Sequence, residues 1–316
     1  MAKNRRTIII ICIIALGILL EGIAYYLLFL SERDRTEISV IVYEDDKNWA
    51  DLKEGAELAA SNEENVEINF IIMPQGTTPE EQKAIILDEI ETRAKYVVTT
   101  ASDSYRLGEL LNGVYASKIE FVLNGTDDKN YRIMAPDDYQ MGYDLGQLLV
   151  QEEGNDISVG IVSLDDSKKS LNIRAQGVRV ALGEANTHYE VWNNNIIGED
   201  LKSFILNKLS NDEVDAIVIL NEGALDTVTA SINETESKVP VYAVVHSEKA
   251  VYYLDSKQLK YLAYTDEFGA GYAAVSDLLH PVKNKFVLGK NTPYSIVKRD
   301  DMYVGQNEKL LFPFVK

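Results

Sequence analysis

Cysteine and histidine are scarce in this chain of 316 residues, which has one cysteine and three histidines. The lone Cys12 cannot form an intrachain disulfide, so the fold cannot depend on a disulfide framework. A structural zinc site needs cysteine and histidine ligands held close together, and His188, His246 and His280 are scattered along the chain. No nucleophile with a matching base and orienting group is visible either. The sequence therefore calls for no metal, no cofactor and no enzymatic reaction.

Positive charge is the second deficit. The chain has 31 Lys and Arg against 50 Asp and Glu, and its formal net charge at pH 7 is −19. Binding to nucleic acid depends on Lys and Arg that neutralise phosphates, and docking on anionic lipid depends on basic clusters. The charge balance argues against both kinds of partner, and we interpret the acidity as a solubility feature.

One long apolar run, Thr7 to Leu30, lies near the N-terminus. About 20 helical residues suffice to span the hydrocarbon core of a bilayer. The residues before the run include three basic side chains, which predicts that this end stays in the cytoplasm while the rest of the chain is exported. We therefore expect a cytoplasmic tail (1–6), a transmembrane anchor (7–30) and a short linker (31–36), with a single pass through the cell membrane.

A cleaved signal peptide is the alternative interpretation of the same run. Such a peptide has a shorter apolar core and a small-x-small cleavage site. The run ends instead in Tyr25-Tyr26-Leu27-Leu28-Phe29-Leu30, without Ala-x-Ala, and interfacial aromatic residues are typical of an anchor. Glu21 is the one carboxylate inside the run, and we expect it near the outer boundary or neutral. These features favour an uncleaved anchor.

Beyond residue 36, short apolar runs alternate with amphipathic stretches. The runs have the length of buried strands, and the stretches repeat apolar residues at three-and-four spacing, as helices do. One helix start is explicit, because Thr78 is followed by Pro79 and then by Glu81, the pattern of a capping box. The expected strands fall into two sets of four: 38–43, 66–73, 96–100 and 119–123, then 157–162, 189–192, 214–220 and 239–245.

Near-continuous apolar strands separated by helices are typical of parallel sheets covered on both faces. Two such sets in sequence predict an α/β fold with two similar lobes, each with a parallel sheet flanked by helices. A second helix is expected to begin at Asp137 or Asp138, either of which could cap it.

Four phrases occur in order along the chain: Ile38 to Tyr43 with Trp49 and Leu52-Lys-Glu-Gly55; Pro136-Asp-Asp138-Tyr-Gln-Met-Gly142; Ile173-Arg174-Ala-Gln-Gly177; and Tyr264 to Val275 with Gly271. Their order and spacing resemble the type I periplasmic binding proteins, the group of the ribose- and galactose-binding proteins. The resemblance covers residues 38 to about 301. Regulators of the lactose-repressor type share this core, but a predicted membrane span stands where their helix-turn-helix would be, which excludes a repressor.

The resemblance implies that the chain crosses between the lobes three times, through a three-strand hinge. One lobe would then consist of residues 37–132 plus 266–288, and the other of residues 133–265 plus 289–316. The ligand would lie in the cleft between the lobes, at the carboxyl ends of the strands.

Candidate ligand-binding residues follow the strands of the first lobe. Trp49 stands where the resemblance places an aromatic ring that stacks on a sugar face, although a core tryptophan would give the same pattern. Asn48 beside it is a further candidate or a helix cap. Asp103 and Asn124 follow the third and fourth expected strands, and Asn124 with the next glycine would equally suit a turn. The Asp-Arg pair that the family often has after the fourth strand is missing.

In the second lobe, Asn172 and Arg174 precede Gly177 at the two spacings where the family has its pocket arginine. The guanidinium offers a planar fork of donors to hydroxyl or carboxylate oxygens, while a solvated helix charge is the alternative.

Three further candidates follow later strands. Asn221 matches the family's asparagine at that place. His246 stands where the family usually has aspartate, and a neutral imidazole offers fewer acceptors than a carboxylate; a loop residue is its alternative role. Thr265 or Asp266 occupies the hinge position at which the family usually has glutamine or a similar polar group.

The function implied by the resemblance is that of an extracytoplasmic solute-binding protein that captures a sugar or a similar small polar molecule. Its partner would be an ABC permease, to which it presents the ligand. A membrane-tethered sensory subunit that signals to a receptor or histidine kinase is the alternative, and an enzyme on the same fold is a third hypothesis.

Overall fold

The computed structural model describes residues 16–23, 35–43, 49–197, 200–245, 247–281 and 292–311. Residues 16–23 are helical. Within the described ranges, no helix combines the length and the apolar character that crossing a membrane requires. The remaining residues of the predicted anchor and most of the predicted linker lie outside these ranges.

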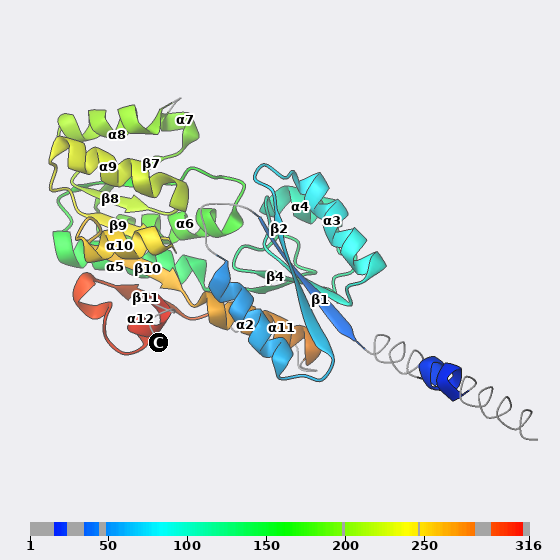
Figure 1. Ribbon diagram of the computed structural model, residues 1–316. Helices are drawn as coiled ribbons and strands as arrows, with labels where there is room; N and C mark the ends of the chain where they lie inside the picture. The colour runs from blue at the N-terminus through cyan, green and yellow to red at the C-terminus, as the bar shows by residue number, and fades with distance from the viewer. Residues whose placement is uncertain are drawn as a thin grey trace, which may run out of the picture.

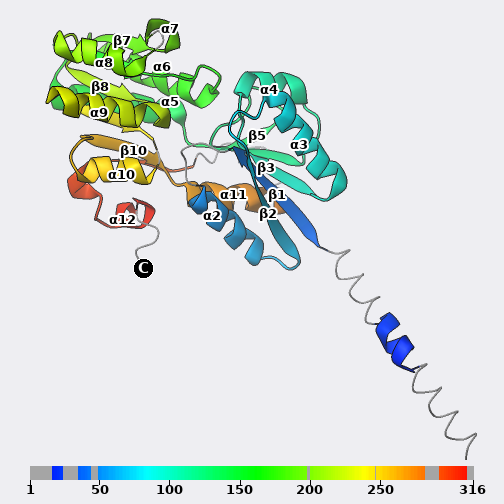
Figure 2. The same cartoon turned by 45° about the horizontal axis from the view of Figure 1, so that its top comes forward.

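The described chain forms two lobes, seen side by side in Figures 1 and 2. The first lobe holds a five-stranded parallel sheet in the order β2-β1-β3-β4-β5. Its strands are β1 (Thr36–Tyr43), β2 (Val66–Met73), β3 (Tyr96–Thr99), β4 (Ile119–Val122) and β5 (Arg132–Met134), and its helices are α2 (Ala50–Ser61), α3 (Pro79–Thr92), α4 (Ser104–Leu111) and α11 (Glu267–Leu279).

The second lobe holds a six-stranded sheet in the order β11-β10-β9-β8-β6-β7, in which only the edge strand β11 is antiparallel to its neighbour. Its strands are β6 (Ser158–Val162), β7 (His188–Trp192), β8 (Ala216–Ile219), β9 (Val241–Val244), β10 (Tyr261–Thr265) and β11 (Tyr294–Val297). Its helices are α5 (Asp138–Glu153), α6 (Lys169–Glu184), α7 (Asn194–Ile197), α8 (Leu201–Ser210), α9 (Leu225–Thr235), α10 (Glu248–Asp255) and α12 (Gln306–Leu311), with short 3₁₀ turns at Glu222–Ala224 and Arg299–Asp301.

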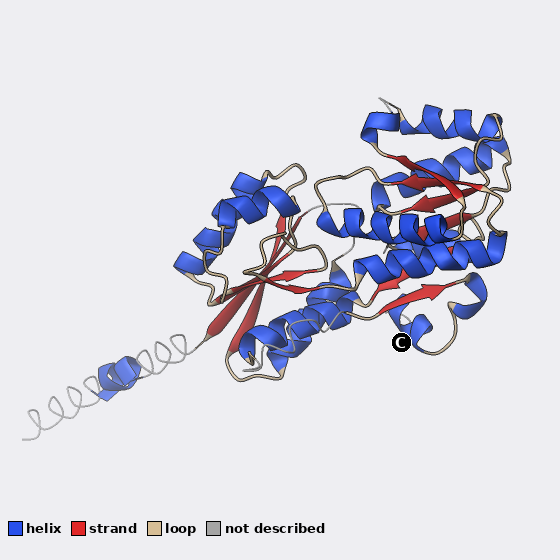
Figure 3. Cartoon of the chain, turned by 180° about the vertical axis from the view of Figure 1, so that it is seen from behind, coloured by secondary structure: helices blue, strands red, loops and turns tan. Residues whose placement is uncertain are grey.

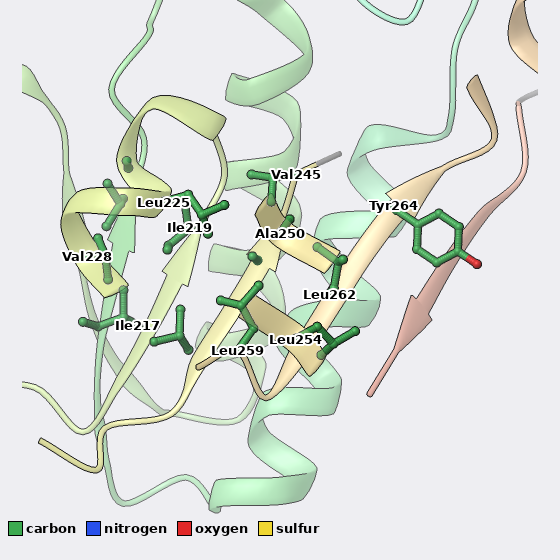
Figure 4. Close-up of a cluster of buried hydrophobic side chains, with 14 of the residues drawn as sticks. Ile217, Ile219, Leu225, Val228, Val245, Ala250, Leu254, Leu259, Leu262 and Tyr264 are labelled. Atoms are coloured by element: carbon green, nitrogen blue, oxygen red, sulfur yellow. The ribbon is translucent and has the colours of Figure 1, made fainter. Parts of the chain in front are cut away.

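Both sheets are covered on both faces, as Figure 3 shows from behind. In the first lobe, α2 and α11 pack with one face of the sheet, and α3 and α4 pack with the other. In the second lobe, α5 and α6 cover one face, and α8, α9 and α10 cover the other. Figure 4 shows part of the latter core, where Leu225 of α9 lies beside Ile219 of β8 and Leu254 of α10 lies beside Leu259 and Leu262. The two-lobed α/β prediction, with parallel sheets flanked by helices, is confirmed.

Local sequence signals place several helix starts. Thr78 and Glu81 form the predicted capping box of α3, with both reciprocal hydrogen bonds present. Asp137, rather than Asp138, caps α5 by accepting a hydrogen bond from the Gln140 N–H. Asp138 is thereby released for a different contact, described below.

The chain passes between the lobes after β5 and after β10. β5 continues to Met134, so the first sheet extends two residues beyond the boundary expected at 132. After β10, α11 returns to the first lobe and packs along α2. Both passages contact the segment that leads into β11. The Thr292 N–H donates to the Ala135 carbonyl at 2.9 Å, and the Asp266 N–H donates to the Pro293 carbonyl at 3.2 Å.

Candidate binding cleft

A cleft of about 310 Å³ lies between the two lobes. Its walls are built by segments at the carboxyl ends of β1, β2, β3 and β4 in one lobe and of β6, β8 and β9 in the other. The lining residues are Tyr43, Trp49, Gln75, Thr100, Leu123, Asn124, Asp165, Lys168, Ser170, Leu171, Arg174, Leu220, Asn221, Glu222, Gly223, Val244 and Val245. The volume suits one small molecule enclosed by both lobes.

Four of the predicted binding residues line this cleft: Trp49, Asn124, Arg174 and Asn221. Asp103, Asn172 and Thr265 do not belong to its lining. Asn48 and His246 lie outside the described residues. The cleft therefore brings together one predicted aromatic and three predicted hydrogen-bonding side chains, two from each lobe.

Trp49 belongs both to the cleft and to the first-lobe core. It is 6% exposed and packs among the buried residues beside α2 and α11. Its indole N–H donates to the Tyr43 carbonyl at 2.9 Å, and the two rings meet edge to face with centroids 5.8 Å apart. Trp49 is therefore mainly a core residue that also presents a small part of its surface to the cleft, so both predicted positions apply to it.

Asn124 is held rigidly at the end of β4. Its side-chain amide donates to the Ala101 carbonyl at 2.7 Å, and its Oδ1 accepts from the Ser104 hydroxyl at 3.3 Å and from the Ser170 hydroxyl at 2.9 Å. Leu123 before it has a positive φ of 63°, which turns the chain at this point. Asn124 therefore follows a turn, as one of the two alternatives for it predicted. Its side-chain amide also belongs to a hydrogen-bond network that joins the two lobes.

Arg174 forms a largely buried ion pair at the floor of the cleft. Its Nε lies 2.6 Å from Asp138 Oδ1, and the two side chains are 16% and 10% exposed. Burial raises the pKa of the Asp138 carboxyl, while the charge of Arg174 and its hydrogen bond act in the opposite direction. Asp138 therefore orients the guanidinium of Arg174 through its Nε. The other N–H groups of the guanidinium remain for further contacts.

Asn221 follows β8 and belongs to the second-lobe wall of the cleft. Its Oδ1 accepts from the Leu164 N–H at 3.2 Å, which ties the loop after β6 to the loop after β8. Glu222 next to it accepts a hydrogen bond from the Ser247 hydroxyl. Both side chains line the cleft, so this wall presents amide and carboxylate oxygens.

The three predicted residues outside the lining have other contacts. Asp103 caps α4, accepting from the N–H groups of Tyr105 and Arg106. Asn172 donates to the Tyr105 hydroxyl at 3.2 Å and to the Asp166 carbonyl at 2.9 Å. Thr265 is buried at the end of β10, where it pairs with Tyr294 of β11.

Sequence reasoning missed several residues of the lining, among them Tyr43, Gln75, Asp165, Lys168 and Glu222. Tyr43 ends the expected strand 38–43, and Glu222 lies two residues after the expected strand 214–220. The ends of strands were therefore an available signal for both. Lys168 had no such signal, because it lies in a loop before α6. Its ammonium nitrogen lies 4.1 Å from the centroid of the Tyr43 ring and donates to the carbonyls of Ala101 and Ser102.

The charged groups of the cleft are engaged with protein partners. Lys168 is bonded to carbonyls and Arg174 to Asp138, while Asp165 accepts hydrogen bonds from Ser167. Across the described ranges, no group of three or more His, Cys, Asp and Glu residues is placed to hold a metal ion. The arrangement suits hydrogen bonding to a small polar molecule beside aromatic and aliphatic surface.

Solved structures with the same fold include solute-binding proteins of transporters. A solute-binding protein of an ABC transporter from Agrobacterium vitis, with bound D-fucose, is 16% identical with a TM-score of 0.75, and the match covers 87% of this chain and 100% of that one. A carbohydrate transporter solute-binding protein from Agrobacterium radiobacter, in complex with D-arabinose, is 18% identical with a TM-score of 0.75, covering 88% and 99%. A chain of the XylFII–LytSN complex is 14% identical with a TM-score of 0.69, covering 84% and 99%.

Curated protein sequences gave no match to this chain. The periplasmic binding protein domain, in contrast, matches residues 38–285, which include both sheets except β11 and every described residue that lines the cleft. This match spans most of the sequence and agrees with the resemblance seen in the four phrases. The chain belongs to the periplasmic binding protein domain family.

Proposed function

We propose that this protein is an extracytoplasmic solute-binding protein, not an enzyme, that captures a small sugar between its lobes and presents it to an ABC permease. The observation that carries the proposal is the cleft itself, with side chains from both lobes at the carboxyl ends of parallel strands. Structures of the same fold hold D-fucose and D-arabinose. Trp49, Asn124, Arg174 and Asn221 are the residues proposed to contact the ligand, with Asn48 and His246 as further candidates.

The chemistry of the lining favours an uncharged, hydroxyl-rich ligand. An anionic ligand is disfavoured, because Arg174 already faces Asp138 and the carboxylates of Asp165 and Glu222 line the cleft beside Lys168. Asparagine amides both donate to and accept from hydroxyl groups, and an aromatic ring suits the apolar face of a sugar. A sugar uses all of these groups without a buried, unpaired charge.

A thermal-shift screen tests the proposal. The purified chain is melted with D-arabinose, D-fucose, D-allose and D-galactose and, separately, with amino acids and nucleosides. A ligand at a hundredfold excess over its Kd stabilises the native state by about 2.7 kcal/mol. We expect a shift with at least one sugar and its loss in Asn221→Leu, which keeps a side chain of similar size without the amide. Shifts with amino acids or nucleosides alone would refute the sugar assignment.

Sensing is the second candidate function, because a chain of the same fold occurs in the two-protein XylFII–LytSN complex. In that case the ligand-bound protein would signal to a membrane receptor or histidine kinase. Cross-linking of the chain in native membranes, followed by mass spectrometry, separates the two. Permease subunits among the cross-linked partners support transport, and a kinase supports sensing.

We also propose that residues 7–30 anchor the protein in the cell membrane, with the lobes outside the cytoplasm. The support is the length of the apolar run and the basic residues before it. Intact mass of the membrane-extracted protein tests this proposal. A mature chain that begins near Ser31 would show cleavage instead.

A further inference from the structure

Direct contacts join the lobes on one side of the cleft. They come from residues 167–172, the loop before α6 and its first turn, which belong to the second lobe. Figure 1 shows α6 on the side of that lobe that faces the first. Their partners in the first lobe lie in the loop after β3, at the start of α4 and after β4.

The backbone and small hydroxyl groups make the first contacts. The Ser104 N–H donates to the Ser167 carbonyl at 2.9 Å, and the Lys169 N–H donates to the Ser104 hydroxyl at 3.0 Å. The Ser170 hydroxyl donates to Asn124 Oδ1 at 2.9 Å. Ser104, Ser170 and Asn124 are all buried, so these hydrogen bonds are shielded from water.

Lys168 adds a charge to this set. Its ammonium group donates to the Ser102 carbonyl at 2.6 Å and to the Ala101 carbonyl at 3.2 Å, and it lies 4.1 Å from the centroid of the Tyr43 ring. All three partners belong to the first lobe, while Lys168 immediately precedes α6 of the second. Hydrogen bonds from an ionised donor are stronger than neutral ones, and a cation over an aromatic face gains further when water is excluded.

We propose that residues 167–172 form an interlobe clasp, with Lys168 as its central contact, that holds the cleft closed when no ligand is bound. Every contact of the clasp joins protein to protein, so none of them requires a bound ligand. A ligand that enters the cleft must wait for the clasp to open, and a bound ligand leaves only after the clasp releases. The clasp also lowers the cost of closure on binding, because the closed state is already populated.

The test measures the distance between the lobes in the absence of any ligand. Cys12 is the only cysteine of the chain, so Cys12→Ser gives a full-length background without thiols. Spin labels are placed at Glu109→Cys on α4 and Arg179→Cys on α6, both at exposed positions, and electron–electron double resonance reports their distance distribution. The parent is expected to give one short distance.

The clasp is then weakened by Lys168→Met together with Ser170→Ala. Lys168→Met removes two interlobe hydrogen bonds and the contact with the Tyr43 ring, and Ser170→Ala removes one interlobe hydrogen bond. Each hydrogen bond lost is expected to move the closed-to-open ratio by up to about ten-fold. A second, longer distance should therefore appear. Lys168→Arg, which keeps the charge and the donors, should restore the short distance. Lys238→Met is the matched control, because Lys238 is exposed in the second lobe and takes no part in the clasp.

Two results would overturn the clasp: a long or broad distance in the parent without ligand, or identical distances in the weakened variant and the Lys238→Met control. Melting curves of each variant show that the lobes remain folded, and Lys168→Met alone is the fallback if the double change unfolds the chain. The experiment uses no ligand, so it succeeds or fails independently of the sugar proposal.

Discussion

The two lobes share a way of packing two helices but differ in where those helices lie in the chain. Each places a pair of helices in close contact through glycines, and the four glycines are those of the family phrases. In the second lobe, α5 and α6 are consecutive helices, and a Cβ at Gly142 or Gly177 would lie 2.2 Å from a carbonyl oxygen of the facing helix. In the first lobe, α2 meets α11 from the far end of the chain, and a Cβ at Gly55 or Gly271 would lie 2.0 or 2.2 Å from such an oxygen.

Each lobe also holds a half-buried arginine beside carboxylates, but the two clusters differ in position. Arg174 lines the cleft and pairs with Asp138 behind it. In the first lobe, Arg132 of β5 lies 3.2 Å from Glu120 of β4 and 2.8 Å from Asp277 of α11, away from the cleft lining. The same pairing of arginine and carboxylate therefore borders the cleft in one lobe and attaches the returning helix α11 in the other.

The largest effect is expected from Arg174→Ala. Removing one partner of a buried ion pair costs about 3–5 kcal/mol of folding stability, because Asp138 is left buried without its cation. Ligand affinity should fall as well. Urea unfolding and calorimetric titration with the sugar found in the screen measure the two losses. Arg132→Ala is the counterpart in the first lobe: it should destabilise the protein and leave the affinity unchanged, and an equal loss of affinity in both variants would contradict the assignment.

A pH-dependent loss of stability is expected from the first-lobe cluster. The pKa of Glu120 is raised from 4.5 to about 8: burial raises it most, the charge of Arg132 lowers it, and the charge and hydrogen bond of Asp277 raise it. Since the folded pKa exceeds the unfolded one, the stabilisation is complete below about 4.5 and is lost as the pH rises toward 8. The slope is about 1.4 kcal/mol per pH unit, or about 2–3 kcal/mol between roughly pH 5.5 and 7.5.

Glu120→Gln removes this titration and keeps the shape of the side chain. Its unfolding free energy should therefore depend less steeply on pH than that of the parent across the same range. Urea unfolding at several pH values gives both curves. Parallel curves would show that Glu120 keeps an ordinary pKa in the folded protein.

The glycine contacts should be of similar importance in both lobes. Gly271→Ala and Gly177→Ala each drive a methyl group into the backbone of a facing helix, and overpacking of this kind costs about 1–3 kcal/mol. Gly183→Ala is the matched control on α6, because a Cβ there meets no atom within 4 Å. Alanine favours a helix over glycine, so the control should be neutral or slightly stabilised. Equal melting temperatures for all three variants would contradict the close packing.

The smallest effect is expected from the helix caps. Asp103→Ala removes the cap of α4, and Asp137→Ala removes the cap of α5. Each should cost about 1 kcal/mol of stability. Because Asp103 is not part of the cleft lining, its loss should leave sugar affinity unchanged; a clear drop in affinity would return it to the binding site.

Much of the architecture followed from local pattern. The eight expected strands correspond to β1–β4 and β6–β9, because a buried parallel strand is a continuous apolar run. Two of the other strands have a weaker local signal, because β5 has three residues and β11 is a half-exposed antiparallel edge. β10 is a buried apolar strand that leads into the last phrase. In the site, side chains directly after strands, such as Asn124 and Asn221, were predictable, because parallel strands end at a common edge.

The sequence by itself thus determined the alternation of strands and helices, the capping box at Thr78 and the group of polar residues at strand ends. These depend on neighbours within a few positions, where spacing alone decides which side chains meet. The tertiary structure decided which aspartate caps α5 and which pairs with Arg174, and it decided that Lys168 reaches the other lobe. Such contacts join residues far apart in the chain, and their partners are fixed only when the helices pack and the two lobes meet.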